Sequence, residues 1–156
     1  MFLVISPLFL FYISRYISSN ISIIWPRTFE ISIASISLLI AIAYMSWGLL
    51  SLWIMGEGTP APITPTRNLV TTGPYKLCRN PIELGTDLYF LSLGTFLDNL
   101  NTGILCLILG MSLGYAYIKL IEERELKLRF AQTYEKYLES TPLFLPKLFS
   151  SKERRQ

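Results

Sequence analysis

Histidine is absent from this chain of 156 residues. Its absence excludes imidazole metal sites, serine–histidine triads and histidine general bases. Cysteine occurs only twice, as Cys78 and Cys106, and this spacing matches neither a zinc site nor a redox motif. We therefore expect no bound metal, and we expect both thiols to be unpaired and without a special role.

Charged residues are also scarce, at 16% of the chain against 51% hydrophobic residues, and the mean hydropathy is +0.42. Residues 31–55 contain no charged side chain. As a helix rising about 1.5 Å per residue, this stretch is about 37 Å long, which is enough to cross the core of a bilayer. The sequence therefore predicts an integral membrane protein, in the plasma membrane or an endomembrane.

The other apolar runs predict one all-α domain, residues 1–156, with about four transmembrane helices. Residues 1–55 are expected to hold two of them, a distorted first helix within residues 1–25 and the span at 31–55. Residues 86–121 are expected to form a helical hairpin from apolar stretches at 84–97 and 102–121, joined by a tight turn at 98–101. Residues 122–156 follow as a charged tail.

Residues 56–85 form a polar loop between the apolar segments and contain five prolines. Because proline fixes φ and lacks a backbone donor, no long helix or central strand is expected to pass through this loop. Residues 59–66 are predicted to form an extended strap. Gly73-Pro74 and Asn80-Pro81 each predict a turn.

The last 38 positions of the chain, which include the tail, carry nine of the 14 basic residues together with six glutamates. This near balance of charge does not favour nucleic-acid binding and is typical of a segment at the cytoplasmic surface of a membrane. Leu126, Phe130, Tyr134 and Tyr137 follow helical spacing, so the tail is predicted to contain an amphipathic helix that ends before residue 141. The apolar residues 143–149 are predicted to dip into the interface. The loop and the tail are expected to share the cytoplasmic face.

Three acidic residues and two glycines are candidates for special roles. Asp87 lies within an apolar stretch, where an ionisable group is costly and is therefore a functional candidate. Glu122 and Glu123 stand where the last apolar run ends, and because neighbours on a helix point about 100° apart, one can face the bundle and the other water. Gly110 and Gly114 suit close helix contact, within the chain or against a second copy, so the oligomeric state stays open.

The loop sequence GTPAPITPTRNLVTTGPYKLCRNPIELG, followed by a hairpin and then by EERELKLRFAQTYEKYLESTPLFLP, resembles the membrane methyltransferase superfamily. Members of that superfamily include isoprenylcysteine carboxyl methyltransferases and phospholipid N-methyltransferases. The resemblance covers residues 56–146 and rests mainly on L-V-T-T-G-P-Y followed by R-N-P. It implies a membrane enzyme that transfers methyl from S-adenosylmethionine to a lipidic acceptor, either a prenylcysteine-type carboxylate or a phospholipid amine.

The resemblance also implies roles for single residues. Those implied to bind S-adenosylmethionine are Arg67, Leu69, Val70, Gly73, Tyr75, Arg79, Asn80, Pro81, Glu122 and Glu123. The candidates for the chemistry are Glu83, Glu122 and Lys119. Lys119 or Arg79 would position a carboxylate acceptor, whereas Glu83, Glu122 or Asp87 would take the proton that an amine must lose.

The chain departs from the family pattern at three places. Glu83 stands where the family usually has tyrosine, Ala131 where it has glycine, and Thr141-Pro142-Leu143 where it has V-P-R. These differences concern the acceptor site more than the donor site. Two other functions stay open: an NADPH-dependent membrane reductase like the steroid 5α-reductases, and a non-catalytic membrane scaffold.

Overall fold

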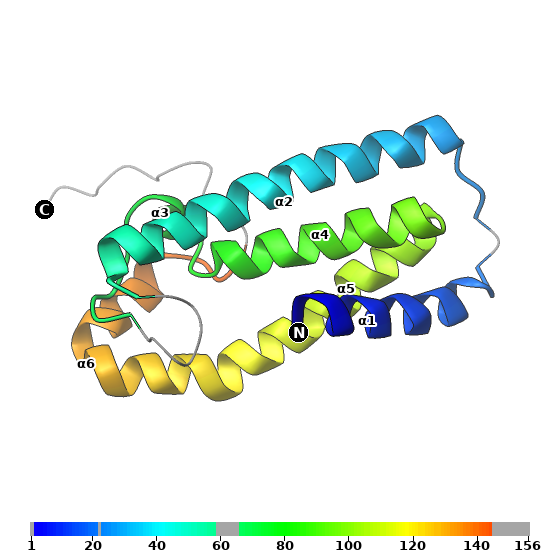
Figure 1. Ribbon diagram of the computed structural model, residues 1–156. Coiled ribbons are helices and arrows are strands. Elements are labelled where there is room, and N and C mark those ends of the chain that lie inside the picture. The colour runs from blue at the N-terminus through cyan, green and yellow to red at the C-terminus, as the bar shows by residue number, and fades with distance from the viewer. Residues whose placement is uncertain (1, 22, 59–65, 145–156) are drawn as a thin grey trace, which may run out of the picture.

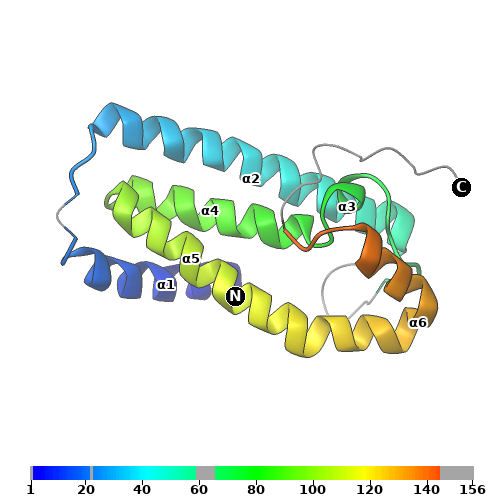
Figure 2. The same ribbon diagram turned by 180° about the vertical axis from the view of Figure 1, so that it is seen from behind.

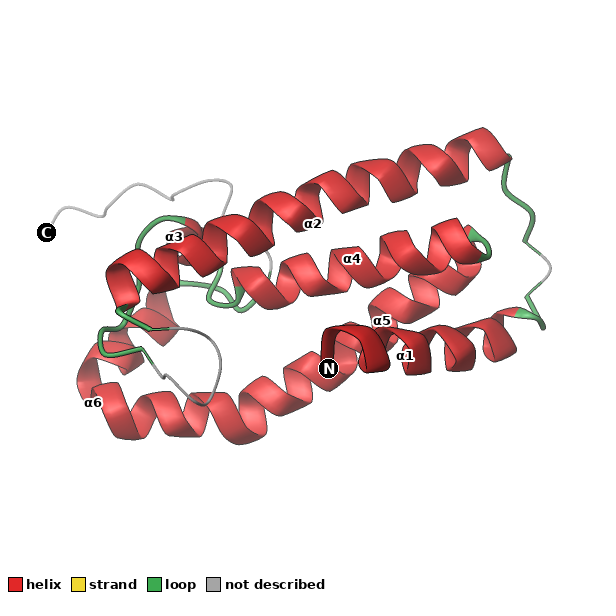
Figure 3. Ribbon diagram, viewed as in Figure 1, coloured by secondary structure: helices red, strands yellow, loops and turns green. Residues whose placement is uncertain are grey.

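The computed structural model describes residues 2–21, 23–58 and 66–144, and every regular element in these ranges is a helix (Figure 3). This confirms the predicted all-α class. Most of the predicted strap at 59–66 and of the predicted interfacial segment at 143–149 lies outside the described residues. The elements are α1 (Phe2–Ser18), α2 (Arg27–Gly56), α3 (Pro74–Leu77), α4 (Pro81–Leu97), α5 (Leu100–Tyr117), the π-helix η1 (Ile118–Glu122) and α6 (Glu123–Ser140).

Within the described residues, two helices are long and apolar enough to cross a membrane. The first is α2, which contains the stretch predicted at 31–55. The second begins with α5, which carries no charged residue, and continues without a break through η1 and α6 to Ser140. The apolar, membrane-crossing part is α5, because charged side chains begin at Lys119 and dominate α6.

Helix α4 lies between α2 and α5 and packs along both of them (Figures 1 and 2). Small residues permit this approach. A Cβ atom on Gly85 would come within 2.6 Å of Met45 Cγ on α2, and one on Gly110 within 2.7 Å of the Phe90 ring. Gly110 and Gly114 therefore form the predicted close helix contact, and they form it with α4 of the same chain.

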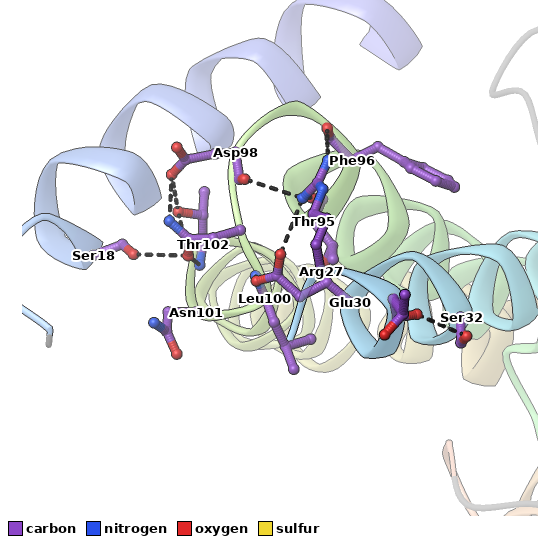
Figure 4. A network of polar contacts seen from close by, with 12 residues as sticks. Ser18, Arg27, Glu30, Ser32, Thr95, Phe96, Asp98, Leu100, Asn101 and Thr102 are labelled. Carbon is purple, nitrogen blue, oxygen red and sulfur yellow. Dashed lines mark hydrogen bonds and ion pairs between the residues drawn. The ribbon is translucent and has the colours of Figure 1, made fainter. Parts of the chain in front are cut away.

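A polar network closes the far end of the bundle, where α4 turns into α5 (Figure 4). Arg27 at the start of α2 donates hydrogen bonds to the carbonyl oxygens of Thr95 and Phe96, at 3.4 and 3.3 Å. The buried carboxylate of Glu30 accepts from the backbone N–H of Leu100 at 2.9 Å. These bonds satisfy backbone groups that the ends of α4 and α5 would otherwise leave unpaired, and so fix the turn.

At Gly73-Pro74 and Asn80-Pro81, where the sequence predicts turns, helices begin, and Gly73 itself lies in a turn with φ 62°. Pro74 is the first residue of α3 and Pro81 the first residue of α4. Proline suits this position because its fixed φ is helical and its missing N–H would be unpaired there anyway. As a result α4 begins three residues before the predicted apolar stretch at 84–97, and it includes Glu83.

Helix α6 bends at Ala131, whose backbone has φ 43° and ψ −125°. An L-residue with a side chain is strained at a positive φ, whereas glycine adopts it freely. Ala131 occupies the position where the superfamily pattern has glycine, so the bend supplies a physical reason for that pattern. The bend turns the second half of α6 back towards the loop (Figure 2).

We predict that Ala131→Gly stabilises the protein by about 1 kcal/mol, because it removes the strain of a positive φ. Lys127→Gly, at a regular and exposed position of the same helix, serves as the control and is expected to cost about 1 kcal/mol. Chemical unfolding of the detergent-solubilised protein measures both values. A loss of stability in Ala131→Gly equal to that of the control would contradict the strained bend.

Candidate functional site

The loop, α3, the start of α4, η1 and α6 meet at one end of the bundle, opposite the α4–α5 turn (Figure 1). A buried ion pair joins them. Arg79 of the loop contacts Glu123 with 2.9 Å between Nη1 and Oε1, and both side chains are only 9% exposed. Lys119 of η1 contacts the same carboxylate oxygen at 2.7 Å. Glu123 thus holds two cations from two segments, which fixes the loop against the helix.

Arg79 has further donor capacity at this junction. Its buried Nε atom has no hydrogen-bond partner among the described residues. A buried donor of this kind costs free energy unless a partner reaches it, so the site favours an additional acceptor such as a carboxylate. The guanidinium is planar and presents donors along more than one edge, so it can bind Glu123 and a second anion together.

An aromatic cluster lies beside the ion pair. Val70 and Tyr75 from the loop and α3 pack against Tyr134 and Tyr137 of α6, with Leu69 at the edge. The Tyr137 hydroxyl donates to the carbonyl oxygen of Tyr75 at 2.5 Å. Burial raises the pKa of Tyr75, and nearby Glu122 raises it further, so this phenol stays neutral.

The segment after α6 completes the junction. The backbone N–H groups of Arg79 and Asn80 donate to the carbonyl oxygens of Pro142 and Leu143, at 2.9 and 3.2 Å. These bonds use backbone atoms, so they form even though Thr141-Pro142-Leu143 departs from the family pattern. They hold Arg79 in place immediately before Pro81 opens α4.

The two neighbouring glutamates have different environments, but neither faces water as the sequence suggested for one of them, because Glu123 is buried and Glu122 is half-buried. Burial and, to a smaller extent, the nearby carboxylates of Glu83, Glu125 and Glu123 together raise the pKa of Glu122 to about 7, although Arg79 lowers it. Burial also opposes ionisation of Glu123, but its hydrogen bonds from Lys119 and Arg79 outweigh that effect and lower its pKa. Glu123 is therefore a structural anion, whereas Glu122 can exchange a proton near neutral pH.

The structure gathers most of the residues singled out in the sequence. Around the ion pair lie Leu69, Val70, Tyr75, Arg79, Asn80, Pro81, Glu83, Lys119, Glu122 and Glu123. Two others lie apart. The side chain of Arg67 is 81% exposed and faces Glu57 at 3.8 Å. Gly73 has φ 62° and packs against Ser51 and Trp47 of α2, so its role is in the turn.

Sequence reasoning missed several parts of the site. Tyr134 and Tyr137 were recognised only as the apolar face of a helix, yet they form one wall of the aromatic cluster. A surface hollow of about 440 Å³ borders Tyr137 and is lined by residues of α3 and α6. A second hollow of about 390 Å³ adjoins it. Only the spacing Y-x-x-Y pointed to these two rings. Cys78, a residue of the loop, is fully buried, and burial raises the pKa of its thiol to about 11.

We predict that Glu122→Gln and Glu123→Gln change stability with opposite dependence on pH. The raised pKa of Glu122 means that the native protein loses stability as pH rises through about 7, so Glu122→Gln gains relative to it between about pH 5 and pH 8. The lowered pKa of Glu123 means that its charge stabilises the fold above the ordinary glutamate pKa. Glu123→Gln is therefore most destabilised near neutral pH and less so in acid. Unfolding curves across this range test both, and parallel trends would contradict the assignment.

The sequence profile of the phospholipid methyltransferase family matches residues 29–133, well over half of the chain and all of the loop and ion-pair residues. Cobalt-zinc-cadmium resistance protein CzcN of Cupriavidus metallidurans is 37% identical over 81 residues, which are 51% of this chain and 36% of that protein. The match thus spans little more than a third of the relative's length. No solved structure gives a significant match. The chain belongs to the phospholipid methyltransferase family.

Proposed function

We propose that this protein transfers a methyl group from S-adenosylmethionine to a lipidic acceptor in the membrane. The observation that carries the proposal is the buried Arg79–Glu123 pair, which brings the loop motif and the E-E motif together although they lie 44 residues apart. A methyltransferase of this family needs both motifs at one site. The family membership supports methyl transfer, and the apolar helices support action in the membrane.

The junction suits the parts of S-adenosylmethionine. The unpartnered Nε of Arg79 fits the carboxylate of the donor's methionine end, which would receive a charge-assisted hydrogen bond. The neutral ring of Tyr75, with Tyr134 beside it, suits an adenine or a sulfonium, since aromatic faces attract both. Glu122 adds a carboxyl group next to Tyr75. When bound, the donor supplies a methyl group on a positively charged sulfur, which is a good leaving group.

The chain's own residues would align the reactants and exclude water. Alignment of this kind can lower a barrier by about 7–11 kcal/mol, so no metal is needed. The buried tyrosines and the segment at 142–143 close the junction on the side of the loop. We place the acceptor on the opposite side, where α4 and α5 border the membrane. In this arrangement α1 and α4 join α2 and α5 as four membrane helices, and the loop and α6 face the cytoplasm.

Calorimetry on the detergent-purified protein tests the donor. We expect S-adenosylmethionine to bind with micromolar affinity, and Tyr75→Ala and Glu122→Ala to weaken it by about tenfold or more, each equivalent to about 1.4 kcal/mol. Arg67→Ala is the matched control, because its exposed side chain lies outside the junction, and it is expected to leave the affinity unchanged. Thermal unfolding of each variant checks that the fold is kept.

The same titration with NADPH separates the alternatives. Binding of NADPH without S-adenosylmethionine would contradict the proposal in favour of a reductase. Binding of neither ligand would favour a scaffold. Equal weakening by Arg67→Ala and Tyr75→Ala would place the donor elsewhere in the loop.

A further inference from the structure

The two surface hollows that border Tyr137 are separate from the ion-pair junction. The hollow of about 440 Å³ is lined by the loop, α3 and the end of α6, and the hollow of about 390 Å³ by the loop and the second half of α6. They share Thr71, Tyr137 and Ser140, so they are two parts of one depression. None of the residues gathered around the ion pair lines either part. A depression of this size has room for a small ligand.

Two lysines from different elements line this depression. Lys76 belongs to α3 and Lys136 to α6, and both side chains are exposed. Neither forms an ion pair with a described residue. The described residues that line the depression include no acid, since Glu135 and Glu139 of α6 lie outside the lining. The depression is therefore positively charged.

Hydroxyl groups lie among the residues that separate the two lysines. Thr71 lines both parts of the depression, Thr141 lines the part with Lys76, and Thr133 lines the part with Lys136. A hydroxyl group rotates to donate a hydrogen bond where an acceptor lies, and a lysine ammonium group carries three donors. Donors of this kind, without a carboxylate to compete for them, suit the oxygen atoms of an anion.

The chain itself holds the two walls of the depression together. The Tyr137 hydroxyl donates to the carbonyl oxygen of Tyr75 at 2.5 Å. Lys76 directly follows Tyr75 and Lys136 directly precedes Tyr137, so this buried bond fixes the two lysine backbones relative to each other. The backbone N–H of Thr141 also donates to the carbonyl oxygen of Tyr137, at 3.1 Å. A ligand here meets walls that are already in place, which lowers the entropy cost of binding.

We propose that the depression is a binding site for a phosphate monoester, held between Lys76 and Lys136. A phosphate monoester carries about 1.5 to 2 negative charges at pH 7 and three acceptor oxygens, which match two ammonium groups and the hydroxyls beside them. A phosphodiester carries a single charge and matches less well. The sulfonium of S-adenosylmethionine is positive and would be repelled by the lysines. The inference goes beyond the proposed function and does not depend on it.

Calorimetry with three probes tests the site and distinguishes a soluble ligand from a lipid. Glycerol phosphate is a soluble monoester, dioctanoyl phosphatidic acid presents the same group on a lipid, and dioctanoyl phosphatidylcholine is a phosphodiester. Each is titrated into the full chain in a nonionic detergent. We expect a monoester to bind at one site per chain, and phosphatidylcholine to bind at least about tenfold more weakly. Binding of both monoesters identifies the phosphate group as the determinant, and binding of phosphatidic acid alone identifies a lipid ligand.

Four variants locate the site. Lys76→Gln and Lys136→Gln are each expected to weaken binding of the monoester by about tenfold or more, because each removes a charge-assisted hydrogen bond. Thr71→Val removes a hydroxyl at constant charge and is expected to weaken binding by about threefold. Lys127→Gln is the matched control, since Lys127 is an exposed lysine of α6 outside the depression. At physiological salt it is expected to change the affinity by less than about twofold. Thermal unfolding checks the fold of each variant.

The contradicting outcomes are distinct. Absence of binding by both monoesters contradicts the site. Equal weakening by Lys127→Gln and by the two depression variants shows a general attraction of a basic chain for anions, and so contradicts a defined site. Phosphatidylcholine that binds as tightly as phosphatidic acid contradicts recognition of a dianion. Displacement of the bound monoester by excess S-adenosylmethionine contradicts a site separate from the donor junction.

Discussion

The buried ion pair between Arg79 and Glu123 is the interaction on which the functional end of this molecule depends. Burying two charges costs several kcal/mol, and the cost is offset only when geometry and further hydrogen bonds are good. Here Lys119 adds a second cation, and the backbone of Arg79 is held by the carbonyl oxygen of Pro142. Removing Glu123 would leave the buried guanidinium of Arg79 without its ion-pair partner. The ion pair therefore fixes the loop and the start of α6 relative to each other.

Helix α4 carries this junction because both of its faces are packed. Gly85 allows α2 to approach on one face, and the glycines of α5 allow approach on the other. The network of Arg27 and Glu30 fixes the far end of α4, and Pro81 fixes its near end two residues after Arg79. A rigid α4 matters because Glu83 projects from its first turn. A shift of this helix would move the carboxyl group away from the junction.

Much of this arrangement follows from the sequence. The charge-free run at 31–55, the apolar hairpin and the helical spacing from Leu126 to Tyr137 each depend on local patterns, and each forms the expected helix. The grouping of Tyr75, Arg79, Glu122 and Glu123 was predicted from the family motifs. Other features depend on contacts that local patterns do not encode. These are the π-helix at Ile118–Glu122, the bend at Ala131 and the return of residues 142–143 to the loop. Asp87 was recognised as costly, but its complete burial follows only from the packing of α4 against α5.

The central claim is that the Arg79–Glu123 pair forms the donor site as a unit, and a double-mutant cycle on donor affinity tests it most directly. Arg79→Gln, Glu123→Gln and the double variant are compared with the native protein by calorimetry with S-adenosylmethionine. The account predicts that the double variant binds no more weakly than the worse single variant, with a coupling free energy of about 1 kcal/mol or more. Strictly additive losses, or affinities that do not change, would contradict it.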